Sequence, residues 1–222
     1  MLITKKEIAK LIDHTLLKPQ ATKDEIGQLC QEAIDNEFWS VCVNPSYVSD
    51  ASRFVDNSVK VSSVVGFPFG ASTSEVKIHE TKKAIQDGAN EIDMVINLGA
   101  LKSGDNKLVK YEIESIVEQG KCLGDTIIKV IIETGLLSEK EKVIACKLVR
   151  ESGANFVKTS TGFNTSGATV HDVKLLRNIV GPHFGVKASG GIRTISDVLR
   201  MIEAGANRIG TSSGVKIVKE II

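Results

Sequence analysis

The segment GANEIDMV at residues 88–95 joins a glycine-containing turn to a short apolar run, and the same pattern recurs as GANFVK at residues 153–158 and GANRIG at residues 205–210. Each copy follows a helical pattern that ends in acidic residues. Glycine is the residue that most readily adopts the left-handed conformation that ends a helix. The three copies therefore predict tight helix-to-strand turns, spaced unequally but each about two strand–helix units apart.

Short apolar runs and longer helical patterns alternate along the whole chain. This alternation predicts strand–helix units and a parallel sheet. The expected strands are Leu11–Thr15, Trp39–Val43, Val61–Gly66, Glu91–Val95, Ile127–Ile132, Asn155–Lys158, Phe184–Lys187 and Asn207–Gly210. Eight parallel strands are the number of a closed (β/α)8 barrel. We therefore predict an α/β protein, a single TIM barrel over residues 1–222 with a short helix at its N-terminus.

Three capping boxes mark the expected starts of helices. A capping box pairs a serine or threonine with a glutamate three residues later, and each side chain accepts a hydrogen bond from a free backbone N–H group. The pairs are Thr22 with Glu25, Ser72 with Glu75, and Ser138 with Glu141. All three lie between expected strands, which supports the alternation.

Composition narrows the classes of function. Lysine and arginine exceed aspartate and glutamate by one charge, too little for the basic surface that nucleic-acid binding needs. The four cysteines form no CxxC pair, which argues against a zinc module. Lysines interrupt the N-terminal segment, and no run of 18 uncharged apolar residues occurs. We expect a cytoplasmic protein that binds neither nucleic acid nor membrane.

Charged residues near the ends of the expected strands indicate an active site. Counting five residues from each repeated glycine reaches Asp93, Lys158 and Gly210. In a barrel, chemistry is built at the C-terminal ends of the strands. Because side chains alternate along a strand, Asp93 and Lys158 are expected to point inward, and Ile92 and Val157 toward the helices.

Three lysines interrupt strands that otherwise read as apolar: Lys129, Lys158 and Lys187. One interpretation is an ion pair with an inward acid such as Asp93 or Glu133. The other is chemical, because Lys158 and Lys187 are expected on neighbouring strands, which lie roughly 4.8 Å apart. Repulsion between the two ammonium groups, together with burial, favours the neutral form of one. A neutral lysine is a nucleophile that can form a Schiff base.

Glycine and hydroxyl residues follow the last three expected strands. The pairs Thr161-Gly162, Gly190-Gly191 and Ser212-Ser213 occupy loops where barrel enzymes commonly bind phosphate through backbone N–H groups. Taken singly, each pair is better explained by an ordinary turn. Together with the lysines they predict a small phosphorylated substrate, and Asp13, Thr15 and Cys42 are expected to line the same pocket.

Two other functions fit part of this pattern. A barrel isomerase of a sugar phosphate or an amino-acid precursor would share the phosphate loops but needs a pair of acid/base carboxylates, and the lysine pair argues against it. A non-catalytic barrel that senses sugar phosphates would leave the cost of two adjacent buried lysines without a purpose.

Seven segments, in order along almost the whole chain, resemble the deoxyribose-phosphate aldolase family of class I aldolases. They are DHTLLKP at 13–19, VCVNP at 41–45, VGFPFG at 65–70, EIDMV at 91–95, FVKTSTG at 156–162, VKASGGIR at 186–193 and RIGTSS at 208–213. The resemblance implies reversible cleavage of 2-deoxy-D-ribose 5-phosphate to D-glyceraldehyde 3-phosphate and acetaldehyde, in deoxyribose phosphate catabolism and without a metal or organic cofactor.

The same resemblance implies roles for three residues. Lys158 would form the Schiff base, Lys187 would keep that amine reactive and take part in proton transfer, and Asp93 would act as general acid/base. Some relatives carry a phosphate-binding lysine where this chain has Phe163, and some use a C-terminal tyrosine, whereas the tyrosines here are Tyr47 and Tyr111. Barrel enzymes of this size often associate, so we expect a homo-oligomer, a dimer or tetramer.

Overall fold

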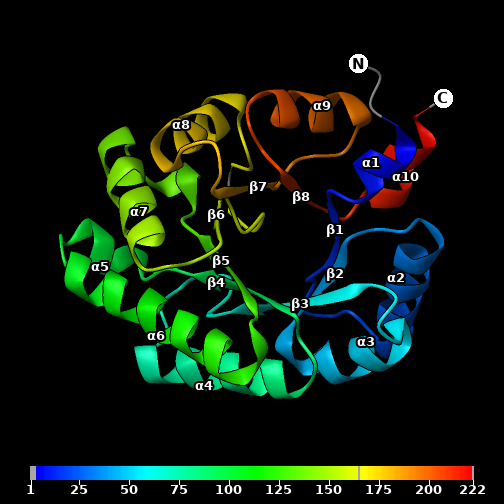
Figure 1. Cartoon of the computed structure of the whole chain (residues 1–222), viewed down its shortest axis with the longest axis horizontal. Helices are drawn as coiled ribbons and strands as arrows, with labels where there is room; N and C mark the ends of the chain where they lie inside the picture. Colours follow the sequence, from blue (N-terminus) through cyan, green and yellow to red (C-terminus); the bar gives the residue numbers. More distant parts are fainter. Residues whose placement is uncertain (1–3, 165, 222) are drawn as a thin grey trace.

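Eight parallel strands close into a barrel in the computed structural model, which describes residues 4–164 and 166–221 (Figure 1). Every strand pairs with the next in sequence, and β1 pairs with β8. The strands are β1 (Ile12–Leu16), β2 (Ser40–Val43), β3 (Lys60–Val65), β4 (Glu91–Val95), β5 (Ile127–Ile131), β6 (Phe156–Lys158), β7 (Gly185–Ser189) and β8 (Arg208–Thr211).

Helices surround the barrel and cover the outer faces of the strands (Figure 1). The α-helices are α1 (Lys5–Ala9), α2 (Lys23–Asp35), α3 (Val48–Val55), α4 (Ser74–Gln86), α5 (Leu98–Lys102), α6 (Asn106–Gly124), α7 (Glu139–Glu151), α8 (Val170–Val180), α9 (Ile195–Glu203) and α10 (Gly214–Lys219). Two short 3-10 helices, η1 (Pro45–Tyr47) and η2 (Thr134–Leu136), follow β2 and β5. Helices α1 and α10 lie together beside β1, near the two ends of the chain.

The predicted (β/α)8 barrel and its short N-terminal helix are confirmed. All eight expected strands form where the apolar runs predicted them, with ends that coincide or differ by no more than two residues. The largest difference is at β7, which continues to Ser189, two residues beyond the expected end at Lys187. The hydrogen-bonded pairing of β7 therefore continues up to the loop that begins with Gly190 and Gly191.

Two of the three predicted capping boxes are confirmed and one is wrong. Thr22 with Glu25 and Ser138 with Glu141 make both reciprocal hydrogen bonds. Helix α4 instead begins one residue later than predicted, with Thr73 before its first turn, so the residue that would complete a box is Val76, which has no carboxylate. The hydroxyl of Ser74 is used elsewhere and donates to Glu112 on α6.

The repeated Gly-Ala-Asn turns share one structure. Their glycines have φ angles of 107°, 79° and 109°, as the left-handed prediction requires. Each asparagine is also bonded twice to the first part of the preceding strand. Asn90, Asn155 and Asn207 accept through Oδ1 from the backbone N–H groups of Val61, Ile128 and Val186, and their own N–H groups donate to the carbonyls of the same three residues.

Side chains on the strands separate into an apolar outer set and a polar inner set. Ile92 and Val157 are fully buried in the core between the sheet and the helices, as predicted. Asp93 and Lys187 are equally buried but lie inside the barrel. Burying charges is costly unless they are paired, so the interior must be a network of ion pairs. Across the described residues, none of the helices has both the length and the apolar character to cross a membrane.

Candidate active site

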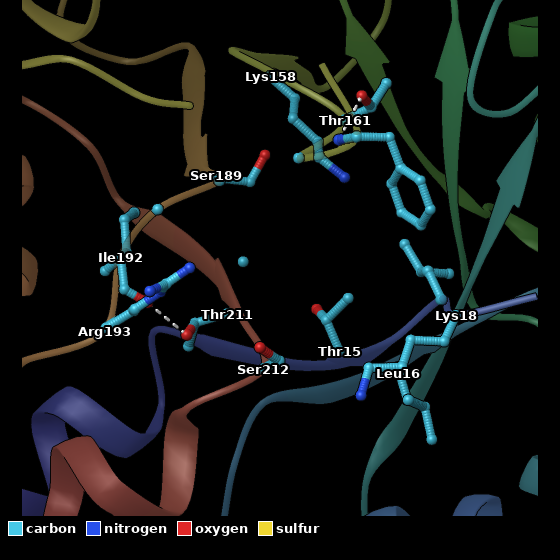
Figure 2. A pocket seen from close by; sticks show the side chains of 16 residues that line it. Thr15, Leu16, Lys18, Lys158, Thr161, Ser189, Ile192, Arg193, Thr211 and Ser212 are labelled. Atoms are coloured by element: carbon cyan, nitrogen blue, oxygen red, sulfur yellow. Dashed lines mark hydrogen bonds between the residues drawn. The ribbon is translucent and has the colours of Figure 1, made fainter. Parts of the chain in front are cut away.

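A cavity of about 230 Å³ opens at the C-terminal ends of β1, β6, β7 and β8 (Figure 2). It is lined by Thr15, Leu16, Leu17, Lys18, Lys158, Thr161, Gly162, Phe163, Ser189, Gly190, Gly191, Ile192, Arg193, Gly210, Thr211 and Ser212. The last three strands and the loops that follow them together supply most of this lining. The cavity therefore lies where barrel enzymes place their chemistry.

Lys158 places its amine between this cavity and the barrel interior. It is the last residue of β6, and its side chain enters the cavity from the top of the view, with Thr15 and Ser212 at the bottom (Figure 2). Only 3% of the residue is exposed. Its Nζ donates to Oδ2 of Asp93 at 2.7 Å. The amine is thus both held by a carboxylate and open to a small molecule.

Asp93 is the common partner of three lysines. Its Oδ1 accepts from Lys129 Nζ at 2.6 Å, and its Oδ2 accepts from both Lys158 and Lys187 at 2.7 Å. The hydroxyl of Ser62 also donates to Oδ1, at 3.1 Å. Lys158 and Lys187 lie opposite each other in the pairing of β6 with β7, as the sequence predicted for neighbouring strands.

Lys129 and Lys187 each have a second carboxylate. Lys187 pairs with Asp13 Oδ2 at 2.5 Å, and Lys129 pairs with Glu91 Oε2 at 2.6 Å. Of the two acids predicted as ion-pair partners, Asp93 is therefore confirmed for Lys129. Glu133 lies elsewhere and accepts from the backbone N–H and the hydroxyl of Thr161.

The local charges distinguish the three lysines. Burial lowers the pKa of Lys158, and the charge of Lys187 acts in the same direction against the attraction of Asp93. Lys129 and Lys187 are buried too, but their two carboxylates outweigh burial and raise the pKa of each. Lys158 is thus the lysine whose environment favours a neutral, nucleophilic amine.

The carboxyl of Asp93 is held in its ionised form. Burial acts to raise its pKa, but the charges of Lys129, Lys158 and Lys187 outweigh burial and place the pKa well below the ordinary value. An ionised Asp93 stabilises the positive charge of a neighbouring ammonium group.

Backbone groups of the glycine-containing loops surround the outer part of the cavity. Gly190 and Gly191 have φ angles of 89° and 77°. Gly190 is also pressed against Gly167, where an added Cβ would lie 2.9 Å from Cα of Gly167. This packing holds the loop after β7 against the loop after β6. The hydroxyl of Thr211 on β8 also donates to the carbonyl of Ile192 at 2.7 Å, which fixes the loop after β7 from its other side. Such a loop pair can present N–H groups to an anion.

The structure brings most predicted site residues together, at two depths. Lys158, Thr15, Thr161, Gly162, Gly190, Gly191 and Ser212 line the cavity. Asp93, Lys187, Asp13 and Cys42 are buried inside the barrel and outside the cavity lining, the first three in direct contact with one another or with Lys158. Ser213 lines an adjoining groove with Ser212, His14 and Lys216.

Sequence reasoning missed two sets of charged residues. Lys18 and Arg193 line the cavity, where a cation can attract a phosphate. Glu91 and Arg208 lie inside the barrel and contact the lysine network. The alternation along β4 contained a signal for Glu91, because it is two residues before the inward Asp93 and therefore shares its face.

The site offers an amine nucleophile, an ionised carboxylate and a loop region suited to an anion. Within the part of the chain that the structure describes, no three His, Cys, Asp or Glu side chains are grouped so as to hold a metal ion.

Comparison with known proteins links this arrangement to a family. The sequence model of the DeoC/LacD family aldolases matches residues 7–220. A deoxyribose-phosphate aldolase of a Thermoanaerobacter species is 59% identical over 214 residues, covering 96% of each chain. Another from Thermococcus gammatolerans is 59% identical over 216 residues, covering 96% of each chain. The tetrameric deoxyribose phosphate aldolase of Aeropyrum pernix superimposes with a TM-score of 0.91 at 37% identity, covering 98% of this chain and 92% of its own.

Proposed function

Since this chain belongs to the DeoC/LacD family of aldolases, we propose that it cleaves 2-deoxy-D-ribose 5-phosphate reversibly to D-glyceraldehyde 3-phosphate and acetaldehyde through a Schiff base on Lys158. The observation that carries this proposal is the position of the Lys158 amine. It borders the cavity, it is almost fully buried, and the charges around it favour its neutral form. The reaction would serve the breakdown of deoxyribose phosphate.

The first steps make the carbon–carbon bond breakable. The neutral amine of Lys158 adds to the aldehyde carbon of the open-chain sugar, and uptake of one proton with loss of water leaves a protonated imine; the proton is released when the imine is hydrolysed at the end of the cycle. Removal of the proton from the hydroxyl at the third carbon then breaks the bond between the second and third carbons. The electron pair of that bond moves to the imine, which becomes a neutral enamine, and glyceraldehyde 3-phosphate leaves. Protonation of the enamine and addition of water release acetaldehyde and restore the amine.

Asp93 and Lys187 are suited to move the protons in this sequence. Asp93 Oδ2 lies 2.7 Å from the nitrogens of both Lys158 and Lys187, so a proton can pass between the two amines through one carboxylate. The ionised carboxylate also stabilises the positive charge of the imine. General acid–base catalysis of this kind typically contributes about 10²- to 10⁴-fold to a rate.

The substrate's phosphate would bind in the loops beyond Lys158. Gly162, Gly190 and Gly191 offer backbone groups, Ser212 offers a hydroxyl, and Arg193 supplies a positive charge on the same cavity. Phe163 occupies the position of a phosphate-binding lysine in some relatives and lines the cavity here. Arg193→Gln should therefore raise KM for the phosphorylated sugar much more than KM for free 2-deoxyribose.

The experiment that tests the mechanism is chemical trapping of the imine. The protein is incubated with acetaldehyde and sodium borohydride, digested and examined by mass spectrometry. We expect one added ethyl group of about 28 Da on Lys158 and loss of activity in proportion to the label. The variant Lys158→Met should remain unlabelled. Active protein without a label on Lys158 would contradict the proposal and favour an isomerase.

We also propose that the protein works as a homo-oligomer in the cytoplasm. Support for an oligomer comes from the tetrameric relative from Aeropyrum pernix. Support for the compartment comes from the cysteines, which are all free thiols and mostly buried, as is usual in reducing surroundings. Light scattering on the purified protein should give a mass two or four times the 23.9 kDa of the chain, and a monomeric mass would contradict the assembly.

A further inference from the structure

Six buried side chains inside the barrel form a closed ring in which acids and bases alternate. Asp93 pairs with Lys129 at 2.6 Å, Lys129 with Glu91 at 2.6 Å, and Glu91 with Arg208 at 3.0 Å. Arg208 pairs in turn with Asp13 at 2.9 Å, Asp13 with Lys187 at 2.5 Å, and Lys187 with Asp93 at 2.7 Å. Residues from β1, β4, β5, β7 and β8 thus meet in one circuit.

The formal charges of the ring cancel, and Lys158 stands outside it. Three carboxylates face three cations, and each member has one neighbour of opposite charge on either side. Lys158 is attached to the ring through Asp93 alone, whose Oδ2 it shares with Lys187. Protonated Lys158 therefore gives this buried cluster a net charge of +1, and neutral Lys158 leaves it without net charge.

On the side of the ring away from the active-site cavity, two aromatic side chains pack against Arg208. The guanidinium carbon of Arg208 lies 4.5 Å from the ring centre of Trp39 and 5.2 Å from that of Phe156. Trp39 Nε1 donates to Glu91 Oε1 at 2.7 Å. Glu91 is 2% exposed and Arg208 6%, so both charges are largely removed from water, although Glu91 and Trp39 also line a second cavity of about 380 Å³ at this end of the barrel. Charges in such surroundings interact strongly.

We propose that Glu91 and Arg208 are positioning residues for the reaction: they complete the ring, so that Lys129 and Lys187 each keep two carboxylates, whereas Lys158 has only Asp93, which it shares with the other two lysines. The proposal rests on the assignment of Lys158 as the Schiff-base lysine. Glu91 and Arg208 act through their neighbours, because both lie outside the lining of the active-site cavity.

The ring predicts what happens when one of its members loses its charge. Without Arg208, Asp13 and Glu91 each lose one cation, so Lys187 is drawn toward Asp13 and Lys129 toward Glu91. Asp93 then interacts mainly with Lys158 and stabilises its ammonium form. Without Glu91, Lys129 turns to Asp93 alone and Arg208 to Asp13 alone, so more positive charge surrounds Lys158. The two losses therefore act on the Lys158 amine in opposite directions.

Several other charged or titratable groups surround Lys158 and remain the same in both variants. Some lie on other strands inside the barrel, and others line or border the cavity. They are Cys42 on β2, Asp93 on β4, Lys129 on β5, Lys187 on β7 and Asp13 on β1, together with Lys18, Glu133 and Arg193 around the pocket.

The test compares Glu91→Gln, Arg208→Gln and the double variant. For each protein, the rate of trapping by acetaldehyde and borohydride and the value of kcat/KM are measured from about pH 5 to about pH 10. The midpoint of the acidic limb reports the deprotonation of the amine. We expect a shift of about one pH unit toward acid in Glu91→Gln and about one unit toward alkali in Arg208→Gln. The double variant restores charge balance, so its midpoint should return close to that of the wild type.

General loosening of the barrel would move both single variants in the same direction and the double variant furthest. Shifts of the same sign, or unchanged midpoints in all three variants, would therefore overturn the proposal. If Arg208→Gln does not fold, two other variants test the proposal. The midpoint of Glu91→Gln should shift toward acid, and that of Arg208→Lys, which keeps the positive charge, should stay close to the midpoint of the wild type. Wild-type protein that resists trapping would instead refute the Schiff base itself, so the two failures are distinguishable.

Discussion

The molecule buries a lysine–carboxylate pair in two different regions. Between helices α4 and α6, Lys77 donates to Glu112 at 3.0 Å and to the carbonyl of Val95 at 3.1 Å. Inside the barrel, Lys158 donates to Asp93 at 2.7 Å. Both lysines are almost completely buried, and burial lowers the pKa of both. Burial and a lowered pKa alone therefore do not identify a reactive amine.

The two regions differ in how many lysines pair with the carboxylate and in whether the amine borders a cavity. Within the described chain, Glu112 forms an ion pair with Lys77 alone, whereas Asp93 pairs with three lysines. Lys77 is enclosed between the helices and the loop after β3, and Lys158 borders a cavity. We conclude that a shared carboxylate and access to a cavity, and not burial, distinguish the candidate nucleophile.

The largest expected effect is that of Lys158→Met. Removing the amine should lower kcat for aldol cleavage roughly 10⁴-fold or more, because no other group can form the imine. The fold should persist, since the variant leaves the neutral ring of ion pairs intact. Steady-state kinetics and circular dichroism test this, and substantial residual turnover would remove the distinction between the two lysines.

Lys77→Met should affect stability instead of catalysis. It leaves Glu112 buried without its cation, which should cost about 3–5 kcal/mol of unfolding free energy. The double variant Lys77→Met with Glu112→Leu should recover most of that loss, because an apolar pair needs no charge compensation. Denaturant titration gives these values, and kcat at a temperature where the variant is folded should stay within about threefold of the wild type. A loss of kcat comparable to that of Lys158→Met would contradict the comparison.

Asp93→Asn should lower kcat about 10²- to 10³-fold by removing the group that transfers protons. It should also change the dependence of stability on pH. Folding lowers the pKa of Asp93, so its charge stabilises the protein above about pH 4 and this contribution is lost as the pH falls further. The decline of the unfolding free energy from about pH 5 to about pH 3 should therefore be smaller in the variant than in the wild type. Equal declines would show that Asp93 is not the main acid-sensitive group.

The smallest effects come from a matched pair of serine substitutions. Ser74→Ala removes a hydrogen bond to Glu112, and Ser62→Ala removes hydrogen bonds to Asp93 and Lys129. Each should cost about 1 kcal/mol of stability. Only Ser62→Ala should also lower kcat, about fivefold, because its loss changes how Asp93 is held. Equal kcat values in the two variants would show that the orientation of Asp93 does not depend on Ser62.

The central lysines could be found from sequence because they break a local rule. Charged side chains are rare in buried parallel strands, so Lys129, Lys158 and Lys187 are visible in an apolar run. Asp93 could be predicted as a site residue because it lies five residues after a repeated glycine, near the C-terminal end of its strand. The barrel itself follows from eight alternations, each of which depends only on nearby residues.

Glu91 and Arg208 were missed because each directly follows a turn, where a charged residue is ordinary. Their role depends on closure of the barrel, which brings Arg208 on β8 against Asp13 on β1, 195 residues away in sequence. The start of α4 was misplaced because serine and threonine are adjacent at residues 72–74, and local propensity does not choose among them. Ser213 differs from its neighbour Ser212 only in loop geometry, which residue type does not specify.

The asparagine turns join three pairs of successive strands in the barrel. Asn90 fastens the start of β4 to β3, Asn155 fastens β6 to β5, and Asn207 fastens β8 to β7. Each of these hydrogen bonds joins a residue of one strand to the residue directly before the next strand. A unit of two strands and the helix between them therefore contains both the donor and the acceptor. A chain emerging from the ribosome could therefore complete these units one after another. A break between β5 and β6 would separate Ile128 from its acceptor, whereas a break between β6 and β7 would leave the three asparagine side-chain hydrogen bonds inside unbroken units and would separate Asn155 only from the N–H group of Gly185, which donates to its carbonyl.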